Sequence, residues 1–338
     1  MKKRVIIILL IASALIISSI PLVFGWGVWG HNHINKGAIL ALPAEMGLFF
    51  YDHTDFIVEE STVPDIRKHM FNDKTEASKH YIDLERYTYT TPANMPEKLN
   101  DAIAKYGKDT LEKYGILPWN IEDMMVKLTD AMKNKRKTEI LYLAADLGHY
   151  IADAYMPLHT TINHNGQLTD QKGIHAFFEG QLPELFGKNY NLNTGEAKYI
   201  KDIPKETWSM VQASFMKADT LLAVDRKLKE TFPREKIYRT DSTGNILKNK
   251  FNDPVHSYDY AKKYHEALNG MVERQIREAI KETANFWYTA WVNAGKPYLS
   301  GLDPEELTKR NEENYKKDVK LWQQGKVSGF KPEQEFNQ

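Results

Sequence analysis

The segment 147–179, LGHYIADAYMPLHTTINHNGQLTDQKGIHAFFE, is the stretch around which we expect the rest of the chain to fold. It contains five residues of types that bind first-row metals through nitrogen or carboxylate oxygen: His149, Asp153, His159, His175 and Glu179. The members of two pairs, His149/Asp153 and His175/Glu179, are four positions apart. Because this spacing places both side chains on one face of a helix, each pair is predicted to reach a single ion.

The alternative for any one such pair is a solvated ion pair on a helix surface, which is the more common situation. Here the neighbouring residues, such as Leu147, Gly148 and Ala152, are apolar or small. Charged groups in apolar surroundings need a partner, and a metal ion satisfies all five at once. Since Pro157 should end the first helix, the segment predicts a metal centre built from two helices and the corner between them.

The composition is that of an ordinary globular protein. Of the 338 residues, 42% are apolar and 27% are charged, which excludes a disordered or fibrous chain. The 45 basic and 45 acidic residues balance, so no broad basic surface for gripping long polyanions is expected. The chain has no cysteine, and disulfides are therefore excluded.

The first 25 residues have the pattern of a secretory signal peptide. Three basic residues at 2–4 precede an apolar run over 5–17, and a small-residue approach ends at Gly25. We expect cleavage after Gly25 and export by a bacterium, to the periplasm or out of the cell. The alternative is an uncleaved membrane anchor, because the apolar segment is nearly long enough to span a bilayer.

Cleavage after Gly25 would make Trp26 the first residue of the mature chain. A free α-amino group and its own carbonyl oxygen can chelate a metal, and His31 follows close behind. The alternative is that Trp26 is an apolar plug at the start of a helix.

Helical periodicity dominates the remaining sequence. Apolar residues recur at three- and four-residue steps from His31 to Leu42, and the same pattern predicts helices over 44–60, 205–232 and 258–293. Residues 233–256 are predicted to form a long loop with a hairpin turn at 242–245. The sequence therefore predicts an all-α fold with a single multi-helix domain over 26–298, followed by a charged C-terminal tail over 299–338.

Five motifs, in this order and spacing, carry a resemblance to a known family. They are WGxxGH from Trp26, a lone Asp65, HYID from His80, HYIADAxxPLH from His149, and IHxFFE ending at Glu179. Together they resemble the superfamily of zinc-dependent phospholipases C and single-strand-specific nucleases of the P-one type. The resemblance implies a mostly helical single domain of that fold type.

The resemblance also implies a set of ligands for three zinc ions per chain. One ion would be held by the amino and carbonyl groups of Trp26, with His31 and Asp153. A second would be held by Asp65, His80 and His149, with Asp153 bridging it to the first. The third would be held by His159, His175 and Glu179.

Such a centre would hydrolyse a phosphodiester. Two zinc ions bridged by a carboxylate can share a water and lower its pKa towards about 7, so that a zinc-bridged hydroxide attacks phosphorus. The third ion would neutralise charge on the leaving oxygen. We expect Asp65 and Asp153 to be catalytic, Asp65 as a ligand that also orients the water.

The sequence leaves the identity of the phosphodiester open. Glu179 is similar to the phospholipase branch, whereas the nuclease branch usually has Asp at this position. In contrast, HYID resembles the nuclease segment in which an aromatic and an acid contact a base, so Tyr81 and Asp83 are candidate substrate residues. Tyr81 packed in the core is the alternative. Arg67, close to Asp65, is a candidate contact for phosphate, and an arginine at the surface is the more common alternative.

Phospholipase C-like cleavage of a phospholipid head group, with contact to a membrane surface, is the first expectation. A nuclease or nucleotidase that acts on single-stranded nucleic acid or nucleotides is the second. A metal-stabilised envelope protein without catalytic activity is an alternative of a different class. Nothing in the sequence indicates an obligate protein partner.

Overall fold

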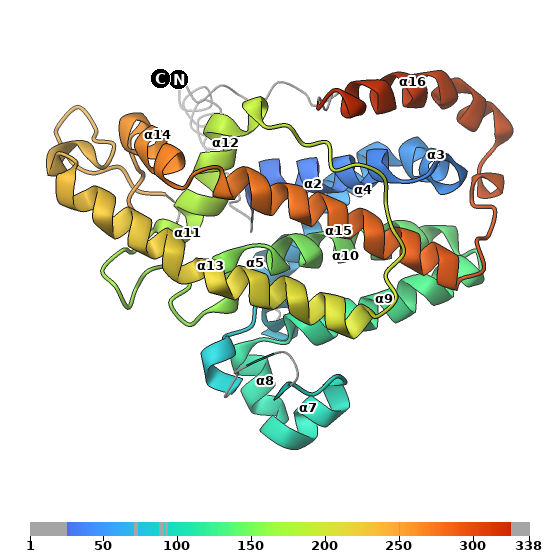
Figure 1. The fold of residues 1–338 in the computed structure, drawn as a ribbon, viewed down its shortest axis with the longest axis horizontal. Helices are drawn as coiled ribbons and strands as arrows, with labels where there is room; N and C mark the ends of the chain where they lie inside the picture. Colours follow the sequence, from blue (N-terminus) through green and yellow to red (C-terminus); the bar gives the residue numbers. More distant parts are fainter. Residues whose placement is uncertain (1–25, 71–73, 88–90, 92–93, 250, 326–338) are drawn as a thin grey trace, which may run out of the picture.

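A computed structural model describes residues 26–325, apart from 71–73, 88–90, 92–93 and 250 (Figure 1). Within these residues the regular structure is helical, and the only β-structure is three isolated bridges between 238 and 256. The all-α fold expected from the sequence is confirmed. The predicted signal peptide and the end of the tail, 326–338, lie outside the described residues.

The α-helices follow one another along the chain as α2 (Gly27–Ala41), α3 (Ala44–Asp52), α4 (Thr54–Glu60), α5 (Val63–Met70), α6 (Lys74–Ala77), α7 (Leu99–Tyr106), α8 (Lys108–Tyr114), α9 (Leu117–Lys133), α10 (Lys137–Ala154), α11 (Ile174–Ala176), α12 (Leu182–Phe186), α13 (Ile203–Thr231), α14 (Tyr258–Ala267), α15 (Met271–Asn293) and α16 (Glu305–Gln323). Short 3₁₀ turns are η1 (Ser78–His80), η2 (Leu84–Tyr87), η4 (Pro157–Thr160), η6 (Gly187–Asn189), η7 (Arg234–Lys236) and η8 (Ser300–Leu302), and η5 (Phe177–Gln181) is a π-helical turn.

Helix α10 is the central element of the fold. It packs against α9, α15, α4 and α2, and in Figure 1 it lies behind α15. Small residues permit this close packing: a Cβ on Gly148 would lie 2.1 Å from Oδ1 of Asn35 on α2. The amide of Asn35 in turn donates to the carbonyl of Ala145 at 3.2 Å. The metal-binding residue types of α10 are therefore held inside the core.

Two predicted helices are each divided in two. The run 44–60 breaks at His53, between α3 and α4. The run 258–293 breaks between α14 and α15, where Asn269 (φ 48°) and Gly270 (φ 73°) both adopt the left-handed conformation. A glycine in this conformation ends a helix, so the expectation of one long helix there was wrong.

The described part of the C-terminal tail is folded onto the domain. Helix α16 packs against α3 and buries Tyr315 and Trp322. Before it, the carboxylate of Asp303 pairs with His53 at 3.0 Å and with Lys137. The segment is thus an integral layer of the fold at one side of the molecule (Figure 1).

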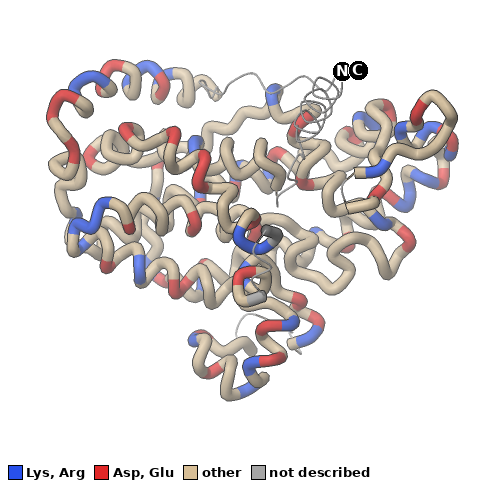
Figure 2. The backbone as a smooth tube through the Cα atoms, turned by 180° about the vertical axis from the view of Figure 1, so that it is seen from behind, with Lys and Arg blue, Asp and Glu red and all other residues tan. Residues whose placement is uncertain are grey.

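Charge is distributed evenly over the described chain. In Figure 2 basic and acidic residues alternate along the helices, and neither sign covers a face of its own. None of the helices in the described ranges is both long enough and apolar enough to span a bilayer.

Candidate metal centre

The first predicted pair lies on the buried face of α10. His149 and Asp153 are fully buried, and Nε2 of the imidazole lies 3.2 Å from Oδ2 of the carboxylate. The four-residue spacing thus produces the predicted geometry: two donor atoms one helical turn apart.

Asp153 stands at the centre of the site, because its two oxygens face different side chains. Oδ1 lies 3.7 Å from Nε2 of His31 on α2 and 3.4 Å from Nδ1 of His159 on η4. Oδ2 lies 2.9 Å from Nδ1 of His80 on η1. One carboxylate therefore joins donors from four elements, an arrangement suited to bridging two ions.

Eight of the nine residues predicted as ligands converge in three sets, each with donor atoms within 4.8 Å of one another: His31, His149 and Asp153; Asp65, His80 and His149; and His159, His175 and Glu179. The first two sets share His149, and we call their five residues the inner group. The third set is the outer group. These buried His, Asp and Glu side chains could hold metal ions.

Polar atoms without partners support this conclusion. Both ring nitrogens of His31, Nδ1 of His159 and Oδ1 of Asp153 are buried and make no hydrogen bond. Buried polar atoms in folded proteins are almost always satisfied, so a cluster of exceptions needs an explanation. A metal ion could supply the missing partner for Oδ1 of Asp153 and for one ring nitrogen of His31, since the second nitrogen of a neutral imidazole carries a proton.

Backbone carbonyls fix the orientation of two histidines. Nδ1 of His149 donates to the carbonyl of Ser61 at 2.8 Å, and Nδ1 of His175 donates to that of His164 at 2.8 Å. A carbonyl only accepts, so the proton is on Nδ1 and the Nε2 lone pair faces the cluster. This is the usual arrangement of a histidine that binds a metal.

The protonation states also suit metal binding. Burial lowers the pKa of His31 to about 3, and neighbouring His149 adds to this effect, so the imidazole is neutral. Burial raises the pKa of Glu179, but His175 and His159 outweigh it and bring the value to about 2. Burial likewise opposes ionisation of Asp153, yet His149 and His159 hold its pKa well below the usual range. Burial opposes protonation of His149 and His175, but Asp153 and Glu179 outweigh it and raise the pKa of these two imidazoles, so metal binding there would release protons.

Trp26, the ninth predicted ligand, is fully buried at the start of α2. Its indole Nε1 donates to the carbonyl of Ala152 at 2.6 Å, and its main-chain nitrogen lies 3.3 Å from Oε2 of Glu179. The side chain is therefore an apolar anchor, while the main chain reaches the centre. The observed contact is with the outer group, whereas the sequence prediction placed Trp26 with His31 and Asp153.

An open cleft of about 570 Å³ gives access to the donors. The outer group lines it together with His80, Tyr81 and Asp83. Tyr81 is partly exposed, and its hydroxyl donates to the carbonyl of Lys113 at 3.1 Å. Burial, with help from Glu85, raises the pKa of Asp83 to about 6. Both candidate substrate residues therefore lie beside the donors.

Arg67 does not line this cleft, and its contact with phosphate stays a prediction. Its Nη2 lies 2.6 Å from Oδ2 of Asp146 and 3.6 Å from Oε1 of Glu76. Three lysines, Lys68, Lys113 and Lys172, do line the cleft, and Nζ of Lys68 lies 2.6 Å from Oδ1 of Asp65. The sequence could have predicted the contact between Lys68 and Asp65, because residues three apart share a helix face.

Two loops form the far wall of the cleft. Phe251, which is 43% exposed, and Asp253 line it from the loop between α13 and α14. Asp253 accepts a hydrogen bond from Nδ2 of Asn165, at 3.3 Å. Asn165 in turn accepts from the backbone of Gly173 at 3.0 Å, so it shapes the loop that leads to His175.

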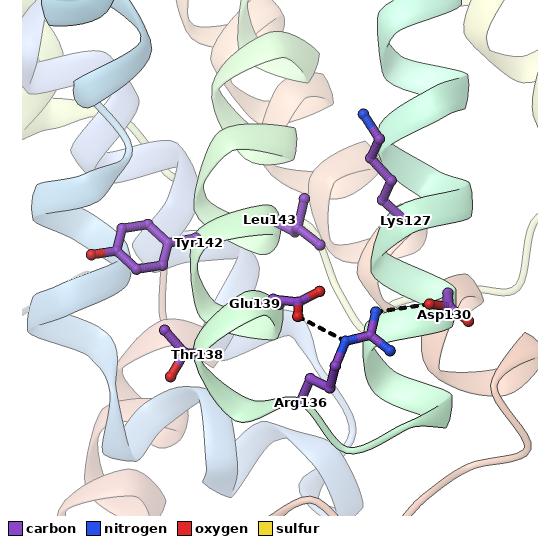
Figure 3. Close-up of a pocket in the computed structure, with 7 residues that line it drawn as sticks. All are labelled: Lys127, Asp130, Arg136, Thr138, Glu139, Tyr142 and Leu143. Atoms are coloured by element: carbon purple, nitrogen blue, oxygen red, sulfur yellow. Dashed lines mark hydrogen bonds and ion pairs between the residues drawn. The ribbon is translucent and has the colours of Figure 1, made fainter.

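A second cavity lies at the turn between α9 and α10 (Figure 3). Its lining includes Arg136, which pairs with Asp130 at 2.7 Å and with Glu139 at 2.8 Å. None of its lining residues belongs to the donor groups. Donor residues of the described chain therefore line the first cleft but not this cavity.

Comparison with known proteins adds no family to this description. No protein-family model matches the chain, and no curated protein is similar enough in sequence to be matched.

Proposed function

We propose that this protein is a zinc-dependent phosphodiester hydrolase with phospholipase C-like activity. The observation that carries the proposal is the carboxylate of Asp153, which faces His31 and His159 with one oxygen and His80 with the other. Nitrogen and carboxylate donors of this kind favour zinc. When bound, zinc ions would activate a water and polarise the phosphoryl group.

The residues of the chain would supply the remaining functions. The inner group would hold two ions, and the outer group, with the main chain of Trp26, a third. Asp65 would orient the attacking water by accepting its hydrogen bond. Lys68 would bind a non-bridging phosphate oxygen, because its ammonium group already lies in the cleft against Asp65.

Exposed apolar side chains favour a phospholipid as the substrate. Phe251 lies at the mouth of the cleft, and Leu168, which is 62% exposed, belongs to the loop that supplies Asn165 and Lys172 to its wall. Such a rim can rest on a lipid surface while a head group enters the cleft. Tyr81 and Asp83, also in the cleft, favour the second candidate, a nuclease that stacks a base on the tyrosine.

The first experiment is to measure the metal content of the purified protein together with its hydrolysis of bis-(p-nitrophenyl) phosphate. We expect about three zinc ions per chain and turnover that is lost on chelation and restored by zinc. Metal-loaded protein that is inert towards every phosphodiester tested would instead favour the non-catalytic envelope protein. Protein without metal and without turnover would overturn the proposal.

A second experiment separates the two substrates. Wild type, Phe251→Ala and Tyr81→Ala are compared on phosphatidylcholine vesicles and on single-stranded DNA. A phospholipase predicts that Phe251→Ala lowers turnover of vesicles but not of a soluble diester. A nuclease predicts activity on DNA that falls about 5-fold or more in Tyr81→Ala, since stacking on one aromatic contributes about 1–3 kcal/mol.

A further inference from the structure

We propose that Glu76 is a positioning residue that holds the imidazole of His80 in the tautomer and orientation required for metal binding. The inference rests on the proposed metal centre and assigns a role to a residue outside the eight donors.

The ring of His80 has one nitrogen inside the centre and one outside it. Nδ1 faces the inner group, 2.9 Å from Oδ2 of Asp153, 3.0 Å from Nε2 of His149 and 3.5 Å from Oδ1 of Asp65. Nε2 is buried, makes no hydrogen bond and lies 3.6 Å from Oε1 of Glu76. Any ion held by this group would therefore bind Nδ1.

Binding through Nδ1 determines where the proton of the ring must be. A ligating nitrogen carries no proton, so the neutral ring carries its proton on Nε2, the atom that faces Glu76. The present 3.6 Å is too long for a hydrogen bond, but a shift of about 0.5 Å would form one. For His149 and His175, backbone carbonyls accept the hydrogen bond from the ring nitrogen that faces away from the centre. For His80 the group in place is a carboxylate, a stronger acceptor that also raises the basicity of the ligand.

Glu76 is itself held firmly in position. It is 3% exposed, its carboxylate accepts a hydrogen bond from the hydroxyl of Tyr150, and it pairs with Lys79 at 2.8 Å. Arg67 lies 3.6 Å away and is anchored by Asp146. Burial raises the pKa of Glu76, but the nearby imidazole of His80 and the hydrogen bonds from Lys79 and Tyr150 outweigh it and bring the pKa below the usual value. Lys79 and Tyr150 thus hold the carboxylate of Glu76 in place beside His80 before any ion binds.

This network also accounts for Arg67 and Asp146, which do not reach the cleft. They form the outer end of a chain of contacts that runs from Asp146 through Arg67 and Glu76 to His80. They reach the proposed metal centre only through Glu76 and His80.

The test compares zinc binding to Glu76→Ala, Glu76→Gln and wild type in the full chain, by titration against a competing chelator. We expect Glu76→Ala to bind the inner ion held by His80 about 10- to 100-fold more weakly, with the other ions unaffected. Glu76→Gln should lie between, because the amide oxygen still accepts a hydrogen bond. Glu122→Gln on α9 is the matched control, a partly buried carboxyl that belongs neither to the donor groups nor to the lining of the cleft, and it should bind zinc as wild type does.

Nitrogen NMR of the zinc-loaded protein provides a readout that a purely structural role would not change. In wild type we expect His80 to carry its proton on Nε2, and in Glu76→Ala we expect this preference to weaken. If Glu76→Ala does not fold, Glu76→Gln decides. If the folded variant matches wild type in both zinc affinity and the tautomer of His80, the role of Glu76 is overturned and the proposed function is not affected. Wild type that binds no zinc overturns the proposed function and the inference together.

Discussion

The inner and outer groups differ in how the chain builds them. All five residues of the inner group are at most 1% exposed, and they come from α2, α5, η1 and α10. The outer group lies within 159–179, on η4, α11 and the π-helical turn η5, and the side chain of His175 is 22% exposed at the cleft. The inner group depends on packing between distant segments, whereas the outer group depends on one local segment.

Under the proposed function, this difference would separate two tasks within one site. Donors fixed in a packed core can hold ions in a constant geometry, which suits the activation of water. Donors at the edge of an open cleft can meet a substrate oxygen. The first three predictions below test whether the two groups are separable in this way, and the fourth concerns a carboxyl outside both.

The largest effect is expected for Asp153→Asn. The amide cannot bridge two ions, so the variant should lose both inner ions and at least about 1,000-fold of the phosphodiesterase activity, while the outer ion is retained. Metal analysis and turnover measure this directly, and circular dichroism checks that α10 still folds. Retention of both inner ions would mean that Asp153 does not bridge.

Glu179→Gln should have a smaller and more selective effect. Its carboxylate lies 3.0 Å from Nε2 of His175 and 3.6 Å from Nε2 of His159, and the loss of its charge should release the outer ion only. We expect two ions per chain and activity lower by about 100-fold. If all ions are lost together, the division into two groups is not valid.

Gly148→Ala tests whether the packing of α10 supports the inner group. The new Cβ would approach Oδ1 of Asn35 to 2.1 Å, and overpacking of this kind costs about 1–3 kcal/mol of unfolding free energy. Zinc affinity of the inner group should fall while that of the outer group stays constant. Gly301→Ala, where the nearest contact is the exposed Tyr298, is the control and should change stability by less than about 0.5 kcal/mol.

Glu122 supplies a reference carboxyl outside both groups. Burial, with Glu97 and Asp202, raises its pKa from 4.5 to about 8, so the folded chain keeps a proton that the unfolded chain has already lost. Stability is therefore lost as pH rises through this window, and Glu122→Gln should be more stable than wild type by about 1–2 kcal/mol at pH 9, after allowance for solvent screening. The two proteins should be equally stable at about pH 4. Denaturation at both pH values checks the sign, and an equal difference at both would exclude titration of Glu122 as the cause.

The sequence was informative where the relevant geometry is local. The four-residue spacings of His149/Asp153 and His175/Glu179 predicted pairs of donors on one face, and the structure has them. Lys68 follows Asp65 by three residues and Glu76 precedes His80 by four, so the same reasoning could have found both. The left-handed break at Asn269 and Gly270 was also a recognisable turn signal.

What the sequence could not provide depends on contacts between distant segments. Nδ1 of His149, which faces away from the donors, is held by a hydrogen bond to the carbonyl of Ser61, 88 positions away. The position of Arg67 is decided by Asp146, on another helix. No local pattern specifies which nitrogen of a histidine faces a centre, because the answer lies in the tertiary packing.

The distances along the chain between donors also set an order of assembly. The outer donors are close in sequence and can meet by closing short loops, whereas His31 must find α10 across most of the N-terminal half of the chain. Contacts of long sequence separation form slowly. In the proposed zinc centre, the local donors of 159–179 would therefore meet zinc first, and the inner ions would enter last, once the helices have packed. Refolding in the presence of zinc should accordingly proceed in two kinetic phases, with catalytic activity appearing only in the slower one.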